Sequence, residues 1–159
     1  MADPTEIPSF GELLRPLLGR VPPSSLPAFL AGLERSAAGR YRGWAESAAD
    51  PEEREGLLAC AQREDEIADR VQKLFPVAGA AAEQVEEHLP EARRSYLEIF
   101  DPHPVRHQYR MQASAEREGA AAWRSLASGQ EDPEARAELA ACAELEETSA
   151  AWLEAWLAR

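Results

Sequence analysis

The sequence contains few β-branched residues, only two cysteines and no long apolar run. Valine and isoleucine together occur eight times among 159 residues, which argues against strands, because strands favour these residue types. Two cysteines, Cys60 and Cys142, do not make a disulfide framework or a zinc motif. No apolar stretch approaches the roughly 20 residues that a membrane-spanning helix needs, and the N-terminal residues Met-Ala-Asp-Pro-Thr-Glu do not resemble a signal peptide. We therefore expect one all-α domain over residues 1–159, located in the cytoplasm and not associated with a membrane.

Acidic residues dominate the charge of the chain. There are 29 aspartates and glutamates against 17 lysines and arginines, which gives a formal net charge of -12. A field of this sign repels phosphate backbones, so we expect no nucleic-acid partner, whereas a cation or a basic protein surface fits the charge. The same acidity also serves solubility. Sequence motifs for nucleotide binding, zinc peptidase and serine hydrolase chemistry are absent.

The chain contains an internal repeat. Residues 34–75 align with residues 116–157 at a constant offset of 82, without a gap and with 15 of 42 positions identical. Shared helical composition produces some matching by chance, but the Asp-Pro-Glu sequence and the cysteine also fall in register. We therefore predict a duplicated unit.

Each copy is predicted to be a helical hairpin with a tight turn. Asp50 and Asp132 are N-cap candidates, and each precedes a proline at the first helical position, where a missing N–H costs nothing. The predicted helices cover about 25–48 and 51–75 in the first copy, then 105–129 and 133–158 in the second.

Two further segments complete the predicted architecture. Phe10 to Leu18 is expected to form a short helix that ends at Gly19. The stretch from Pro76 to His103 is long enough to connect the ends of a bundle, and Pro90 is expected to open a fresh helical segment there. Two hairpins with a long, partly helical crossover predict a four-helix bundle.

Helical spacing places one glutamate of each long helix among apolar residues. Glu34, Glu64, Glu116 and Glu146 all fall on or beside the apolar faces. In the first hairpin these faces consist of Leu26, Leu30, Leu33, Ala37, Tyr41 and Trp44 on one helix, and Leu57, Cys60, Ala61, Ile67, Ala68 and Val71 on the other.

Four converging carboxylates need an explanation, because a buried, ionised carboxylate is costly unless it is paired or bound to a cation. The four glutamates can bind metal, take up protons and share hydrogen bonds, or pair with arginines that reach the core. Alternatively, some lie at the edge of the apolar face and extend to water.

The arrangement resembles the ferritin-like superfamily, particularly its rubrerythrin-like branch. That family repeats a helical hairpin with a lone Glu on the first helix and a Glu-x-x-His about thirty residues later. Glu34 and Glu116 match the lone positions, and Glu64 and Glu146 match the second motif. Tyr41 matches a common family aromatic. The resemblance covers about residues 25–75 and 105–158, and it implies an iron or manganese site.

The chain departs from this family at both histidines. Ile67 and Ser149 occupy the positions where the family has the nitrogen ligands of its two irons. The favoured prediction is therefore a degenerate ferritin-like bundle that acts as a non-catalytic structural or partner-binding protein. The alternative is a metal-binding oxidoreductase or metal store, which uses a carboxylate-rich site of Glu34, Glu64, Glu116 and Glu146 and favours manganese or ferrous iron.

The remaining candidate groups have simpler interpretations. His88, His103 and His107 lie in or near the crossover, away from the motif positions, and are not predicted to be ligands. The two cysteines are expected to be buried, unpaired thiols. Trp152 falls on a flank of the last helix, where it is a candidate for a homodimer surface or another protein partner.

Overall fold

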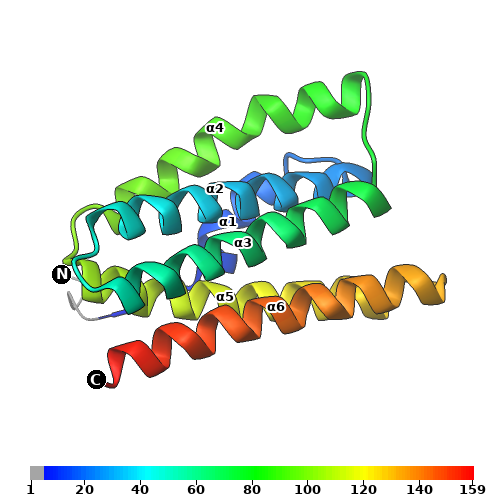
Figure 1. Cartoon of the computed structure of the whole chain (residues 1–159). Helices are drawn as coiled ribbons and strands as arrows, with labels where there is room; N and C mark the ends of the chain where they lie inside the picture. Colours follow the sequence, from blue (N-terminus) through cyan, green and yellow to red (C-terminus); the bar gives the residue numbers. More distant parts are fainter. Residues whose placement is uncertain (1–5) are drawn as a thin grey trace.

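The computed structural model describes residues 6–159, and the regular elements of this part of the chain are all helices, without a strand (Figure 1). The prediction of an all-α protein is confirmed. The helices are α1 (Phe10–Leu18), a 3-10 turn η1 (Pro23–Ser25), α2 (Leu26–Ser47), α3 (Pro51–Leu74), α4 (Ala80–Phe100), α5 (Val105–Ser128) and α6 (Pro133–Leu157).

Two predictions concern membranes and export. None of the helices in residues 6–159 is both long enough and apolar enough to cross a membrane. The prediction that the chain lacks a signal peptide falls mostly on residues 1–5, which lie outside the described residues.

The turns of both hairpins are built from the same local contacts. Asp50 caps α3 by accepting hydrogen bonds from the backbone N–H groups of its first turn, and Asp132 does the same for α6. The guanidinium of Arg54 donates to the carbonyl of Ala48 at 2.7 Å, where α2 ends. Arg136, 82 positions later, makes the equivalent contact with the last residues before α6. The predicted caps and helix boundaries agree with the structure to within a residue or two.

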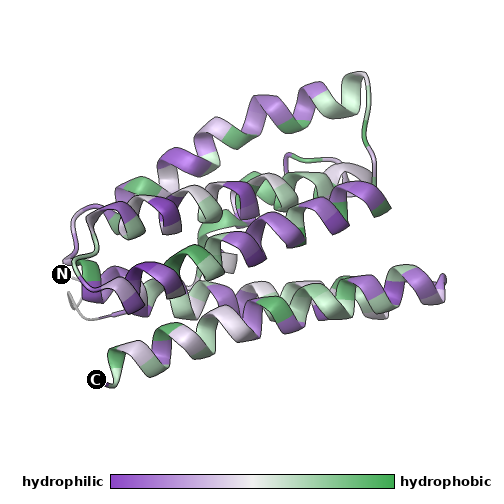
Figure 2. Ribbon diagram, viewed as in Figure 1, coloured by the Kyte–Doolittle hydropathy of each residue, from purple (hydrophilic) through white to green (hydrophobic). Residues whose placement is uncertain are grey.

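The long helices pack as two antiparallel hairpins, with a further helix on one side. α2 lies against α3 and α5 against α6 (Figure 1). Between the hairpins, α3 packs against α6, and side-chain hydrogen bonds join α2 to α5. α4 runs along the outer side of α2, and α1 touches both α4 and α5. Every long helix carries hydrophobic and hydrophilic segments (Figure 2), as helices that bury one face must.

The crossover differs from the prediction at Pro90. Pro90 does not open a new helix; it lies inside the continuous helix α4. A proline inside a helix removes one backbone N–H and crowds the carbonyl four residues earlier, a cost that tertiary packing has to offset. Leu89 and Ala92 are buried on either side of Pro90, and their packing against the bundle holds the two halves of α4 in line.

The apolar face of α2 is wider than predicted. Leu26 and Leu30 are half-buried, whereas Phe29, which the predicted stripe omitted, is fully buried. The reason is that α2 is covered on two sides. Its second buried face packs with residues of α1 and α4, and Phe29 belongs to that cluster.

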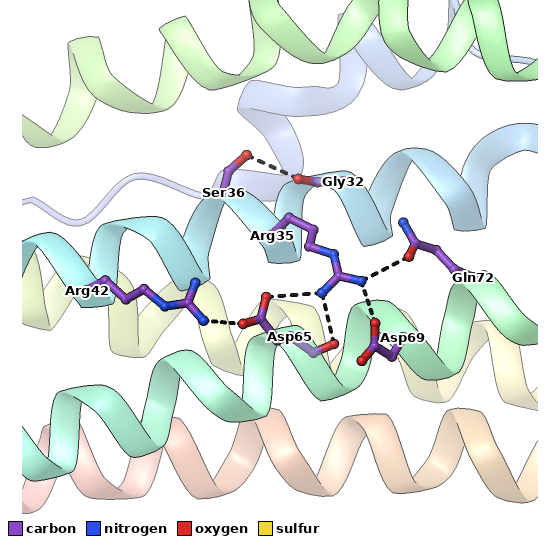
Figure 3. A network of polar contacts seen from close by, with 7 residues as sticks. All are labelled: Gly32, Arg35, Ser36, Arg42, Asp65, Asp69 and Gln72. Carbon is purple, nitrogen blue, oxygen red and sulfur yellow. Dashed lines mark hydrogen bonds and ion pairs between the residues drawn. The ribbon is translucent and has the colours of Figure 1, made fainter.

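Equivalent ion pairs join the two helices of each hairpin. Figure 3 shows Arg35 and Arg42 of α2, both in contact with Asp65 of α3. In the second hairpin, Arg117 and Arg124 of α5 contact Glu147 of α6, and all three positions are shifted by 82. These equivalent contacts support the predicted repeat.

Candidate metal centre

The four glutamates that the sequence placed on core faces come from four different helices. Glu64 of α3, Glu116 of α5 and Glu146 of α6 are at most 2% exposed. Glu34 of α2 is half-buried, because it lines a cavity. One carboxylate oxygen from each of Glu34, Glu64 and Glu146 lies within 4.8 Å of the others. The glutamates therefore gather at one buried place between the hairpins.

Neutral donors hold these carboxylates in position. The hydroxyl of Tyr41 and the amide nitrogen of Gln112 donate to Oε1 of Glu116, at 2.7 and 2.6 Å. The indole N–H of Trp123 donates to Oε1 of Glu146 at 2.9 Å. Each donor approaches a single oxygen of its carboxylate, so the side chains are oriented without being fully satisfied.

Two oxygens of the cluster remain without a partner. Oε2 of Glu64 and Oε2 of Glu116 are buried and accept no hydrogen bond from residues 6–159. A buried acceptor without a donor costs about 1–3 kcal/mol, and more when it carries a charge. These two oxygens are therefore positions where a proton or a cation stabilises the site.

Arginine pairing does not explain the cluster. In the described part of the chain, none of the four glutamates forms an ion pair with an arginine, lysine or histidine. Extension to bulk water is also excluded for Glu64, Glu116 and Glu146, which are buried. Two of the original alternatives remain, namely protons and metal.

The environment favours the protonated forms of Glu34, Glu64 and Glu146 when no cation is bound. Burial, followed by the negative charge of Glu116, raises the pKa of Glu34 to about 8. Burial and the charges of Glu116 and Glu34 raise the pKa of Glu64 well above its ordinary value. The pKa of Glu146 is also raised, first by burial and then by the charge of Glu34. Desolvation and like-charge repulsion therefore act in the same direction.

The two positions that lack histidine lie in the core near the cluster. Ile67 and Ser149 are fully buried. The Ser149 hydroxyl donates to Oε1 of Glu64 at 3.3 Å and accepts a bond from Nε of Arg63 at 3.0 Å. Ile67 offers no donor atom, so the described residues supply an all-oxygen cluster.

A cavity of about 130 Å³ reaches the cluster from the side that α1 covers. Glu34, Glu116 and Glu146 line it together with apolar side chains of α1 and α2, such as Leu14 and Leu33. α1 is attached to α5 here, because Glu118 accepts the backbone N–H groups of Phe10 and Gly11 at 3.1 and 2.7 Å. The cavity gives small ions and water a route to the carboxylates.

Sequence reasoning missed some of the polar residues of the site. Gln112 was not singled out, although it stands four residues before Glu116, on the same helical face. The role of Trp123 as a donor was not predicted either. Its indole N–H bond to Glu146 depends on how α5 and α6 pair, which the sequence does not show.

The other candidate groups lie as follows. Cys60 and Cys142 are buried and unpaired, as predicted. The rings of His103 and His107 lie near the start of α5, with centroids 4.5 Å apart and planes tilted by 40°, and do not belong to the glutamate cluster. Trp152 is half-buried and packs on Gly56 of α3. Part of its ring is therefore used within the fold, and its role at a partner surface stays a prediction.

Comparison with known proteins identifies no relative of this chain. No protein-family model, no curated protein and no solved structure matches it. The resemblance to the ferritin-like superfamily thus stays a prediction based on the glutamate positions, and function has to be inferred from the geometry of the site.

Proposed function

We propose that this chain is a ferritin-like four-helix bundle that binds a divalent metal ion at Glu34, Glu64 and Glu146, with Glu116 as a fourth carboxylate. The observation that carries the proposal is the close approach of three carboxylate oxygens, within 4.8 Å of one another, at a buried place. A cation there would neutralise the repulsion between the acids. It would also supply a partner for the unpaired oxygens of Glu64 and Glu116.

The donor set favours particular ions. Carboxylate oxygens are hard ligands that suit manganese and ferrous iron, whereas copper and zinc prefer nitrogen and sulfur donors. Tyr41, Gln112 and Trp123 would act as outer donors that orient the ligands, in the way that such groups tune known metal sites. The bound ion would supply Lewis acidity and, for iron, redox capacity.

The missing histidines limit the chemistry that we propose. With Ile67 and Ser149 at the family's nitrogen-ligand positions, oxidase and peroxidase activities are not carried over to this chain. We therefore propose binding or storage of the ion, and we assign no substrate.

A second candidate function rests on the hydrogen bond from Ser149 to Glu64 and on the raised pKa of Glu34. Both features are compatible with protonated glutamates that need no metal. The bundle would then be a non-catalytic structural or partner-binding protein. In this candidate function the partner is another protein or a second copy of the chain.

Metal content separates the two candidates. Protein from cells grown with added iron or manganese is analysed for metal, alongside a Glu64→Gln plus Glu146→Gln variant. Glu55→Gln serves as control, because Glu55 is an exposed acid on α3, the helix that carries Glu64. Metal binding predicts one or more ions per chain in the wild type and the control, and loss of the ion in the double variant. A wild-type content well below one ion per chain would exclude the metal site and favour the second candidate.

A further inference from the structure

A second hollow, of about 390 Å³, lies on the outer side of α2, beneath α4. It adjoins the cavity of the glutamate cluster, because Arg40 and Tyr96 line both. Its own lining contains three arginines and no acidic residue: Arg35, Ser36, Gly39, Arg40, Arg93, Tyr96 and Leu97. In a chain with a net charge of -12, such a concentration of positive charge is unexpected. We call this hollow the arginine groove.

Two of the three arginines have no acidic partner. Arg35 is neutralised by Asp65 and Asp69 of α3 (Figure 3). Arg40 and Arg93, in contrast, form no ion pair with any residue of the range 6–159. Among the other arginines of residues 6–159, Arg54, Arg63, Arg94, Arg106, Arg110 and Arg136 also form no ion pair, so the distinguishing feature of Arg40 and Arg93 is that both line the same hollow.

The unpaired guanidinium groups are held in place by their Nε atoms. Nε of Arg93 donates to the hydroxyl of Ser36 at 2.8 Å, and Nε of Arg40 donates to Oε1 of Gln112 at 3.1 Å. The Arg40 guanidinium also lies over the rings of Phe100 and Tyr96, at 4.4 and 5.3 Å from their centroids. Because the neutral partners engage only Nε, the terminal nitrogens of both groups are left for another acceptor.

We propose that the arginine groove binds an oxyanion, a carboxylate or phosphate group on a small organic molecule, through Arg40 and Arg93. Guanidinium groups bind such anions with two parallel hydrogen bonds, and fixing them in advance reduces the entropy that binding costs. Tyr96 and the half-exposed Leu97 provide an apolar surface for the body of the ligand. The site differs in chemistry from the proposed metal centre but is linked to it, because Gln112, the partner of Arg40, also donates to Glu116.

Binding is measured by calorimetry on protein treated with chelator, so that no metal can hold the anion. Phenyl phosphate and benzoate test the two head groups, inorganic phosphate tests the head group alone, and phenyltrimethylammonium tests the opposite charge. At least one of the two aromatic anions is expected to saturate the protein at about 1 mM or below, an affinity within reach of a few charged hydrogen bonds. The cation is expected not to bind. Equal binding of cation and anions, or no saturation by either anion, would overturn the proposal.

Variants locate the binding site. Arg93→Gln is expected to weaken binding about tenfold, because it removes a charged hydrogen-bond donor. Arg94→Gln is the matched control, since Arg94 is the exposed neighbour on α4 and does not line the groove. Equal losses in the two variants would show unspecific attraction by charge and contradict the proposal.

A second pair of variants avoids any change to the arginines. An added Cβ at Gly39 or Gly43 of α2 meets no atom within 4 Å, so both positions accept a side chain. Gly39→Asp places a carboxylate in the groove and is expected to abolish anion binding. Gly43→Asp carries the same charge outside the groove and is expected to bind nearly as well as the wild type. Full binding by the Gly39→Asp variant would rule out this site.

Discussion

The hydroxyl of Ser149 on α6 donates a hydrogen bond of 3.3 Å to Oε1 of Glu64 on α3. This contact crosses the interface between the two hairpins, and it lies where the resembled family has a histidine. By that resemblance, serine offers a hydrogen-bond donor to a neighbouring carboxylate at the position where the family has a metal ligand. The exchange makes position 149 a direct test of what the cluster does.

Replacement of Ser149 should separate ligation from hydrogen bonding. Ser149→His restores a Glu-x-x-His spacing from Glu146, and we expect it to strengthen ferrous or zinc binding at least about tenfold, because imidazole is a good ligand for both ions. It should also cost about 1–3 kcal/mol of metal-free stability, because the position is fully buried. Ser149→Ala should lower the free energy of unfolding by about 1 kcal/mol, because the hydrogen bond to Glu64 is lost, and should not raise the metal affinity. Titration with metal and denaturant measures both effects, and equal affinities in the two variants would contradict the expected ligation.

The metal-free protein should lose stability as the pH rises from about 5 to 8. Burial and neighbouring charge raise the folded-state pKa of Glu34 to about 8, and the pKa values of Glu64 and Glu146 are raised as well. In the unfolded chain these acids titrate near 4.5. Between these pKa values the folded state therefore binds more protons than the unfolded chain. The resulting stabilisation is complete below the unfolded-state pKa and is lost as the pH rises through the folded-state pKa.

Urea unfolding at several pH values measures this effect. We expect the free energy of unfolding to fall by about 2 kcal/mol or more between pH 5 and pH 8. Glu64→Gln plus Glu146→Gln should flatten the dependence, because two of the titrating groups are removed. A metal-free wild type that grows more stable over the same range would contradict the assigned protonation.

Gly119 of α5 should be required for the position of Glu146. A Cβ at residue 119 would lie 2.7 Å from Oε1 of Glu146, closer than van der Waals contact allows. We expect Gly119→Ala to displace this carboxylate and weaken metal binding about tenfold or more, since small displacements of ligands are costly. Gly43→Ala is the control in open space on α2, where removing a helical glycine should stabilise the protein by about 0.5–1 kcal/mol. Unchanged metal affinity in Gly119→Ala would show that Glu146 is not a ligand.

Gly56 should be required for the contact between α3 and α6. A Cβ at this position would lie 1.9 Å from the indole ring of Trp152, so the ring has to move. We expect Gly56→Ala to destabilise the protein by about 1–3 kcal/mol despite the higher helix propensity of alanine. Thermal unfolding measures the change, and a gain in stability would show that the ring moves freely.

Local signals in the sequence were sufficient for the four helices of the hairpins and for the inward positions of Glu64, Glu116 and Glu146. Asp50 and Asp132, each followed by proline, predict the starts of α3 and α6 because capping depends only on adjacent residues. Helical periodicity placed Glu64, Glu116 and Glu146 among apolar neighbours, and all three are buried. The repeat at offset 82 predicted equivalent positions for the two hairpins.

Long-range packing decided what the sequence could not show. Pro90 stays inside α4 and Phe29 is buried because α4 covers α2, a contact that no local pattern encodes. The hydrogen bond from Tyr41 to Glu116 and the contact of Arg40 with Gln112 join residues more than 70 positions apart. Capping and amphipathicity act within a few turns of one helix, whereas the partners of a buried carboxylate depend on how separate helices pack.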